Sequence, residues 1–331
     1  MRDATAKGTP MDLRELKFGI EIETIKRTRQ TVAEAVRTVV GDTVRHVGTP
    51  ACYDPWEVAD ARGRIWKVVA DSSLTSVPGH LRAEVVSPIL TYSDLGELQR
   101  VVRSIRKLAG AKVNSACGLH VHVDASAFNG RALANLAKIF YKQEELIIRA
   151  LGISPERLRR YCRPTREDFI RDIDRRKPRT REQLNRLWYG YRNTAPIHYD
   201  SSRYVLLNLH STFYRNSVEY RGYPATLHAG KVKAAIQFSL AIAAKALNAR
   251  AASSRKRKAN SRSDRYDLRV FLLHLGLVGD EFKTCREHLL ANLAGSAAGK
   301  NGRPTQPAAR TEPTSAAEEH PQPQNEGEGE C

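Results

Sequence analysis

The stretch GLHVHVD, from Gly118 to Asp124, alternates apolar with polar side chains and predicts a β-strand whose two faces differ in character. Valines occupy one face, whereas His120, His122 and Asp124 share the other. Two imidazoles and a carboxylate can hold a metal or a phosphate, although histidines also serve in ordinary hydrogen bonds. The function of these polar side chains therefore depends on which other groups lie on the same face.

Three other segments have the same alternation and carry charged groups on one face. Glu21 and Glu23 are two residues apart in ELKFGIEIE, which sets their Cα atoms roughly 7 Å apart on one side of a strand. Glu84 lies in AEVVSP, and Glu219 and Arg221 are again two residues apart in VEYRG. Four strands thus offer carboxylate or imidazole groups to what could be a single surface.

The rest of the chain alternates between helix-like and strand-like segments. Apolar residues at helical spacing predict helices over 32–41, 93–110, 129–152, 229–252 and 266–295. Strands are expected over 15–23, 64–71, 82–90, 118–125, 202–211 and 216–225. This order predicts an α+β fold, in which an antiparallel sheet carries helices on its back and a polar, ligand-facing front.

The organisation of the chain predicts one catalytic domain with flexible ends. Residues 1–15 are expected to be a flexible lead-in, and 16–294 contain the periodic segments. Within them, 154–200 is dense in arginine and aspartate, which predicts an insert of short helices and loops. From 295 to 331 the composition changes to Pro, Gly, Glu, Gln and Ser, which predicts a disordered tail without a core.

Composition and charge restrict the class of protein. The 331 residues are 41% hydrophobic, which is ordinary for a globular chain, and carry a formal net charge of +18. Without the tail, 51 basic side chains stand against 30 acidic ones, which predicts attraction to polyanions. No apolar run approaches the roughly 18 residues of a membrane span, and the N-terminus lacks the apolar core of a signal peptide. We therefore expect a cytoplasmic protein without membrane contact.

The predicted polar face favours a site for divalent metal. Several carboxylates in one partly dry cleft repel one another and lose solvation, unless bound cations neutralise them. Oxygen ligands with one or two imidazoles suit Mg²⁺ or Mn²⁺. Zinc more often takes three dedicated ligands in a tight cage, and the five cysteines are irregularly spaced with no C-x-x-C pair. We predict magnesium or manganese.

Arginines add cationic groups near the same strands. Arg203 precedes YVLLNL, and Arg221 shares a face with Glu219. Guanidinium groups match phosphate and carboxylate geometry, and a face of carboxylates, metal and arginine suits phosphoryl transfer from a nucleotide. The sequence contains no Walker A motif and no glycine-rich kinase loop, so a nucleotide would bind by other means.

Six of these segments resemble, in the same order, segments of the amidoligase family, which belongs to the carboxylate–amine ligase superfamily with glutamine synthetase and glutamate–cysteine ligase. The resemblance spans roughly residues 16–250, with 154–200 as a variable insert. The matching segments are FGIEIE (18–23), WKVVADSSL (66–74), AEVVSPIL (83–90), CGLHVHVD (117–124), RYVLLNL (203–209) and VEYRGYPATL (218–227).

The resemblance implies a glutamine-synthetase-like domain. The concave face of a curved antiparallel sheet would hold ATP, divalent metal and an acceptor carboxylate, and helices would cover the convex side. The implied reaction is ATP-dependent ligation, in which the carboxylate of an amino acid, peptide or protein becomes an acyl phosphate. An amine then displaces phosphate and leaves an amide or isopeptide bond.

The resemblance also implies roles by position. The metal ligands would be Glu21, Glu23, Glu84, His120 and Glu219. The ATP-binding residues would be His120, His122, Arg203 and Arg221. The catalytic residues would be Arg203, Arg221 and Asp71, with Asp71 and Ser73 facing the substrate or the incoming amine.

One segment departs from the pattern of the family. Family members often have a Gly-Thr-Leu run after the E-x-R pair, whereas this chain has Pro224 and Ala225 before Thr226 and Leu227. A loop reshaped in this way would change substrate contacts rather than the chemistry.

Two other functions stay open. A nucleic-acid-binding protein is favoured by the net charge, by the arginine-rich insert 154–200 and by the RKRK run at 255–258. Aromatic residues in the insert, such as Trp188, Tyr189 and Tyr191, could stack on bases. A metal-dependent hydrolase would need no ATP and would use His120, His122, Glu21 and Glu84.

Overall fold

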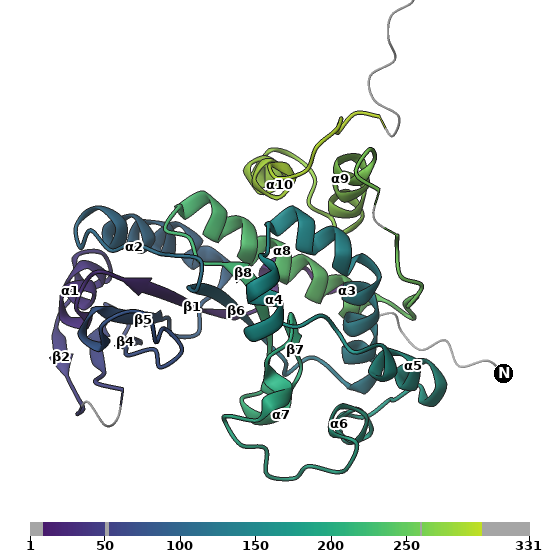
Figure 1. Cartoon of the computed structure of the whole chain (residues 1–331), viewed down its shortest axis with the longest axis horizontal. Helices are drawn as coiled ribbons and strands as arrows, with labels where there is room; N and C mark the ends of the chain where they lie inside the picture. The colour runs from purple at the N-terminus through teal and green to yellow at the C-terminus, as the bar shows by residue number, and fades with distance from the viewer. Residues whose placement is uncertain (1–8, 50–52, 259, 300–331) are drawn as a thin grey trace, which may run out of the picture.

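The computed structural model describes residues 9–49, 53–258 and 260–299 and contains an eight-stranded antiparallel sheet (Figure 1). The strands cross the sheet in the order β2-β3-β4-β5-β1-β6-β8-β7. Their bounds are Phe18–Ile25 (β1), Val44–His46 (β2), Trp56–Ala59 (β3), Ile65–Val69 (β4), Arg82–Val86 (β5), Gly118–Asp124 (β6), Leu207–Asn208 (β7) and Ser217–Pro224 (β8). The strands with the predicted polar face, β5, β1, β6 and β8, are therefore neighbours.

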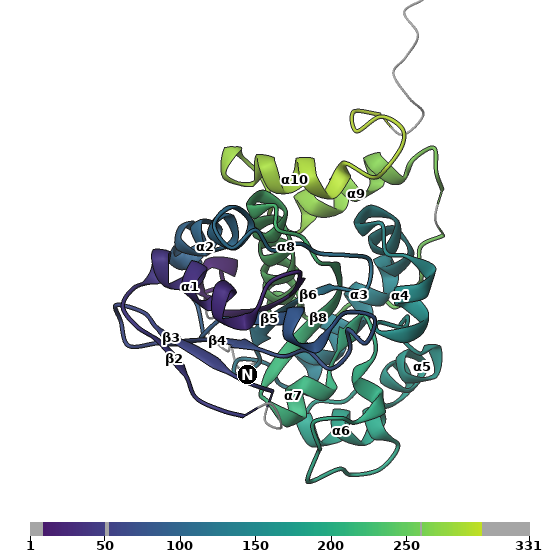
Figure 2. The same cartoon turned by 60° about the vertical axis from the view of Figure 1, so that its left-hand side comes forward.

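The longer helices pack against this sheet. Helices α1, α3 and α8 contact the strands, α2 packs on α1 and α8, and α10 covers the outer side of α8 together with α9 (Figures 1 and 2). The helices are Arg29–Val40 (α1), Leu95–Lys107 (α2), Gly130–Leu151 (α3), Pro155–Arg160 (α4), Glu167–Arg176 (α5), Arg181–Tyr189 (α6), His210–Tyr214 (α7), Ala229–Asn248 (α8), Asp264–His274 (α9) and Lys283–Leu290 (α10). None of the helices in the described part of the chain has the length and apolar character needed to cross a bilayer.

The alternation along the central strands decides which face of the sheet is buried. Ile20 of β1 is paired with Val121 of β6, and both are fully buried in the main core. Glu21 and His120, the next pair along the ladder, lie on the opposite face because successive side chains alternate. The predicted α+β fold with an antiparallel sheet is confirmed.

Helix ends follow from the local sequence. The Thr28 side chain accepts a hydrogen bond from the Thr31 amide at the start of α1, and Gly41, with φ of 139°, ends it. Asn129 caps α3 in the same way, and Gly152, with φ of 62°, ends that helix.

The strand predicted over 202–211 is wrong in extent. Only Leu207–Asn208 pairs with β8, Ser201–Arg203 form a 3-10 turn (η5), and His210 already begins α7. The Leu206 amide instead donates to the Arg163 carbonyl within the insert, so part of this backbone pairs outside the sheet. The apolar run therefore reflects burial against the core and not a long strand. The β2–β3 hairpin was not predicted, because most of its residues are partly exposed.

The segment 154–200 has the predicted short helices, α4, α5 and α6. The domain boundaries at 16 and 294 stay predictions. Within the predicted lead-in, Leu13 begins a 3-10 turn (η1, Leu13–Glu15) and its side chain is buried. Residues 1–8 of that lead-in and 300–331 of the predicted tail lie outside the described residues.

We expect Ile22→Ala to lower the free energy of unfolding by about 2–5 kcal/mol, because Ile22 of β1 is fully buried and the substitution leaves a cavity. Urea denaturation measures the change. The control is Ile65→Ala on the same sheet, where the side chain is 36% exposed and the expected loss is about 1 kcal/mol or less. Equal losses in the two variants would contradict the assigned strand register.

Candidate active site

The strand register brings the predicted polar side chains together on one face. They come from β5, β1, β6 and β8, which are adjacent in the sheet. The register sets them in three directly opposed pairs, which are Glu84–Glu23, Glu21–His120 and His122–Glu219. Residues from four distant segments therefore converge on the face of the sheet opposite the buried core side chains.

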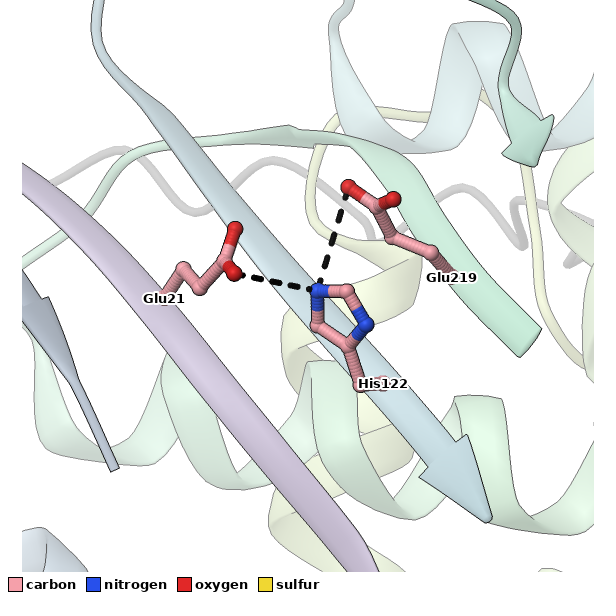
Figure 3. A group of neighbouring side chains, drawn as sticks. All are labelled: Glu21, His122 and Glu219. Atoms are coloured by element: carbon pink, nitrogen blue, oxygen red, sulfur yellow. Dashed lines mark ion pairs between the residues drawn. The ribbon is translucent and has the colours of Figure 1, made fainter. Parts of the chain in front are cut away.

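His122 lies between two carboxylates (Figure 3). Its Nε2 is 3.4 Å from Oε1 of Glu21 and 3.9 Å from Oε1 of Glu219. On the other side of the ring, Nδ1 lies 3.0 Å from Oγ of Ser217, which is in turn 2.9 Å from Oγ of Ser211. Ser217 thus fixes the ring, while Nε2 is buried and has no hydrogen-bond partner among the described residues.

A second group of ligand-type atoms shares Glu21 with the first. Nδ1 of His120 is 3.1 Å from Oε2 of Glu21. One ligand atom from each of Glu21, Glu84 and His120 lies within 4.8 Å of the others, and the same holds for Glu21, His122 and Glu219. The face can therefore hold one or two cations, with the Glu21 carboxylate between them.

Two carboxylates of the cluster stay charged because cationic groups contact them. Burial acts to raise the pKa of Glu219, but Arg221 and the two histidines lower it to about 2. Burial also acts to raise the pKa of Glu21, but His122 and His120 hold it well below its ordinary value. In return, Glu21 and Glu219 raise the pKa of His122 against the effect of burial.

The pKa values of Glu23 and Glu84 are raised instead, because the effect of burial outweighs that of the nearby cationic groups. Burial, with the charge on Asp71, raises the pKa of Glu23 to about 8. Burial and the charges on Glu21 and Glu23 raise the pKa of Glu84 well above its ordinary value. Without a cation Glu23 therefore holds its proton at neutral pH, and a cation that bound there would displace the proton.

Arg221 lies on the polar face because it is two residues from Glu219 on β8. It donates from Nη1 to Oε1 of Glu219. A bulge then sets two residues of β8, Arg221 and Gly222, against one of β6, so that Tyr223 lies in the core like Tyr220. Strand alternation thus supplies a buried, ion-paired guanidinium to the cluster.

Two predicted residues lie at the rim of the cluster. Arg203 donates from Nη1 to the carbonyl of His198 at 2.9 Å, and its guanidinium lies 5.8 Å from the Tyr204 ring centroid. Asp71 follows β4 and accepts hydrogen bonds from the amide and hydroxyl of Ser73, both at 2.7 Å. Neither belongs to the groups that could hold a metal, so both are better suited to contact a substrate.

The sequence analysis missed Arg215 and gave Asn208 no role. Nη1 of Arg215 is 3.2 Å from Oε1 of Glu21, and its Nη2 is 2.8 Å from Nε2 of His198. Nδ2 of Asn208 donates to Oε2 of Glu219 at 2.7 Å. Arg215 ends α7, and Asn216, with φ of 57°, separates it from β8, so strand alternation gave no signal for Arg215.

Comparison with known proteins bears on this geometry. Residues 14–243, well over half of the chain, match the model of the family described as "Putative amidoligase enzyme". The chain belongs to the amidoligase family. The family resemblance found in the sequence is thus confirmed. No curated protein matches the sequence of this amidoligase-family chain.

Among solved structures, one match is a bifunctional glutathione synthetase from Pasteurella multocida. The sequence identity is 11% and the TM-score is 0.40, over 84% of this chain and 47% of that chain. This amidoligase-family chain therefore spans about half the length of that protein.

A cavity of about 430 Å³ adjoins the cluster in this amidoligase-family chain. Glu21 and His122 lie at one side of it, and Arg215 adds a cationic group. Pro88 and Ile89 add apolar surface, and Ile89 is 70% exposed. A cavity of this size accommodates a small substrate or the end of a larger one.

The basic run at 255–258 is partly engaged within the molecule. Nζ of Lys256 is 3.8 Å from Oε2 of Glu144, and Arg257 forms an ion pair with Asp267. Trp188, predicted as a residue that could stack on bases, is buried. These contacts remove part of the surface on which the nucleic-acid alternative depends.

For the metal-free protein, we expect thermal stability to fall as the pH rises from about 5 to about 8. The pKa of Glu23 rises from an ordinary 4.5 to about 8 on folding, so in this interval the unfolded chain releases a proton that the folded chain keeps. Higher pH therefore favours unfolding. Calorimetric melting in a chelator measures the effect, and added Mg²⁺ should raise the melting temperature most at the upper end of the interval.

Two matched variants complete this test. Glu23→Gln should make the melting temperature of the metal-free protein depend less on pH, and Glu57→Gln on β3 should leave that pH dependence unchanged. A wild-type profile without this slope, or a Mg²⁺ effect that does not grow with pH, would contradict the electrostatic description of the cluster.

Proposed function

We propose that the protein is an ATP-dependent carboxylate–amine ligase that joins an amino acid, peptide or protein carboxylate to an amine through an acyl phosphate. The observation that carries the proposal is the pair of glutamate–histidine groups sharing Glu21, beside Arg221 and an open cavity. Membership of the amidoligase family supports an amide-forming ligase in general. ATP dependence, the acyl phosphate and a glutamine-synthetase-like sheet belong to the proposal.

The donor set of the cluster fits Mg²⁺ or Mn²⁺. Carboxylates outnumber imidazoles, as these cations prefer. The unpartnered Nε2 of His122 lies beside Glu21 and Glu219, as expected for a ligand atom. Of the ligands predicted from the sequence, Glu21, Glu84, His120 and Glu219 belong to these two groups, and His122 is added to them. Glu23, with Oε1 3.7 Å from Nε2 of His120, stays a proposed ligand outside the two groups. When bound, the cation would neutralise phosphate charge and favour phosphoryl transfer.

Arginines would bind the anionic parts of the reactants. Arg221 is fixed by Glu219, and Arg215 is fixed between Glu21 and His198. Guanidinium groups that are already oriented can stabilise charge in the transition state without reorganising. Arg203, at the rim, would contact ATP or the acyl phosphate.

The reaction would proceed in two steps. An acceptor carboxylate oxygen attacks the terminal phosphorus of ATP, the bond to the bridging oxygen breaks, and ADP leaves. The amine nitrogen then attacks the carbonyl carbon of the acyl phosphate, and phosphate leaves with the bonding electron pair. A base takes the proton of the amine, and Asp71, whose carboxylate is oriented by Ser73, is the proposed base.

Hydroxylamine trapping tests the proposal directly. The protein is incubated with ATP, Mg²⁺, hydroxylamine and a panel of amino acids and acidic peptides. We expect release of ADP coupled to formation of a hydroxamate from one acceptor class. Hydrolysis of a substrate in the absence of ATP would contradict the proposal and favour the metal-dependent hydrolase.

We expect Glu21→Gln to weaken Mn²⁺ binding by about a hundredfold or more and to abolish hydroxamate formation, because Glu21 belongs to both ligand groups. Isothermal titration calorimetry measures the Mn²⁺ affinity. The matched control is Glu57→Gln on β3, where Glu57 pairs with Arg45 and Lys67 instead. Equal Mn²⁺ affinities in the two variants would show that the assigned ligands are wrong.

A further inference from the structure

The arginine-rich segment 154–200 contributes one guanidinium to the interior of the molecule. Every residue of this segment is described, and of its arginines only Arg157 is buried, with 3% of its surface exposed. Arg157 lies in α4, whose first turn is capped by the Ser154 side chain. From there the side chain extends to the start of β6, the strand that carries the two histidines.

The backbone before β6 fixes one edge of the Arg157 guanidinium. Nη1 donates to the carbonyl oxygens of Ala116 and Cys117, both at 2.8 Å. Nε is buried and has no hydrogen-bond partner among the residues that the structure describes. Nη2 lies beside Gly118, 2.9 Å from the position that a Cβ would occupy, and Nε2 of His120 is 2.8 Å from the same position. Arg157 and His120 are thus neighbours across a glycine that leaves room for both.

The Arg157 guanidinium has few compensating contacts: its carbon lies 5.8 Å from the Tyr161 ring centroid, and its charge acts against burial to lower the pKa of Glu23. A guanidinium stays protonated at any physiological pH, and a buried cation without an anion is unfavourable. Within residues 9–49, 53–258 and 260–299, no carboxylate forms an ion pair with Arg157. Glu23, which also lies beside Gly118, directs Oε2 to the Gly118 amide at 2.6 Å. An anionic ligand would supply the missing partner.

We propose that Arg157 is a phosphoryl-binding residue of this site, with Nε and Nη2 as donors to phosphoryl oxygens. The inference rests on the proposed function, because His120 belongs to a group proposed to hold a cation. An anion beside Gly118 would lie between that cation and the guanidinium, an arrangement that suits a phosphoryl group. The phosphoryl group could belong to the nucleotide or to the acyl phosphate, and the experiment separates these two sources.

The test uses the full chain as wild type, Arg157→Gln, Arg157→Lys and Arg160→Gln. Arg160 is the matched control, because it lies in the same helix, is exposed and forms an ion pair with Glu156. Calorimetric titrations measure the affinity for Mn²⁺ alone and for the β,γ-imido analogue of ATP in Mg²⁺. Hydroxamate formation at saturating ATP reports on the acyl phosphate.

We expect Arg157→Gln to weaken binding of the ATP analogue by about tenfold or more, Arg157→Lys to weaken it less, and Arg160→Gln to have no effect. Mn²⁺ affinity should be the same in all four proteins. Unchanged analogue binding with a tenfold or greater loss of hydroxamate would support the acyl phosphate as the source. If neither quantity differs between the Arg157 variants and Arg160→Gln, the inference is wrong.

Two further results separate this inference from the proposed function. A wild type that binds Mn²⁺ but neither the analogue nor any acceptor would contradict the proposed function, and the inference with it. If the Arg157 variants do not fold, a wild-type crystal structure with the analogue and Mg²⁺ decides. We expect a phosphoryl oxygen about 3 Å from Nε or Nη2 of Arg157. An analogue bound away from both atoms, with hydroxamate still formed, would overturn the inference.

Discussion

The contact of Glu21 with His120 and His122 is the interaction on which the rest of the site depends. Oε2 of Glu21 is 3.1 Å from one imidazole and Oε1 is 3.4 Å from the other, so one carboxylate links both ligand groups. Its position follows from the buried side chains on the other face of β1, Ile20 and Ile22. A register slip by one residue would bury the glutamate and expose the isoleucines, so the hydrophobic core holds the site in place.

The part of the site that lies on regular strands could be predicted from sequence. A period of two is enough to put Glu21, Glu23 and Glu84 on the face of His120 and His122, and the register then aligns them. The edges of the site could not be predicted in this way. Arg203 lies in η5, whose backbone does not continue the sheet, and Arg215 lies at the end of α7, before β8 begins. Arg157 contacts the start of β6 from helix α4, and the alternation of side chains along strands cannot predict such a contact.

The distribution of charge explains why the site needs groups from outside the sheet. The strands supply mainly carboxylates, and burial raises the pKa values of two of them, Glu23 and Glu84, with a further contribution from neighbouring carboxylates. The segments around the sheet supply guanidinium groups: Arg157 from α4, Arg203 from η5 and Arg215 from the turn before β8. An anionic reactant would therefore bind near carboxylates only where cations neutralise them. At the edges of the site it would contact arginines. This division suits a phosphoryl group that binds between metal and guanidinium.

Anomalous diffraction tests most directly whether Glu21 is the carboxylate that binds the cation. Crystals of the wild-type chain grown with Mn²⁺ would be measured at the manganese absorption edge. The account predicts manganese bound to the Glu21 carboxylate together with His120, His122 or both. Well-ordered crystals in which manganese binds only elsewhere, or in which Glu21 contacts no ion at saturating Mn²⁺, would contradict it.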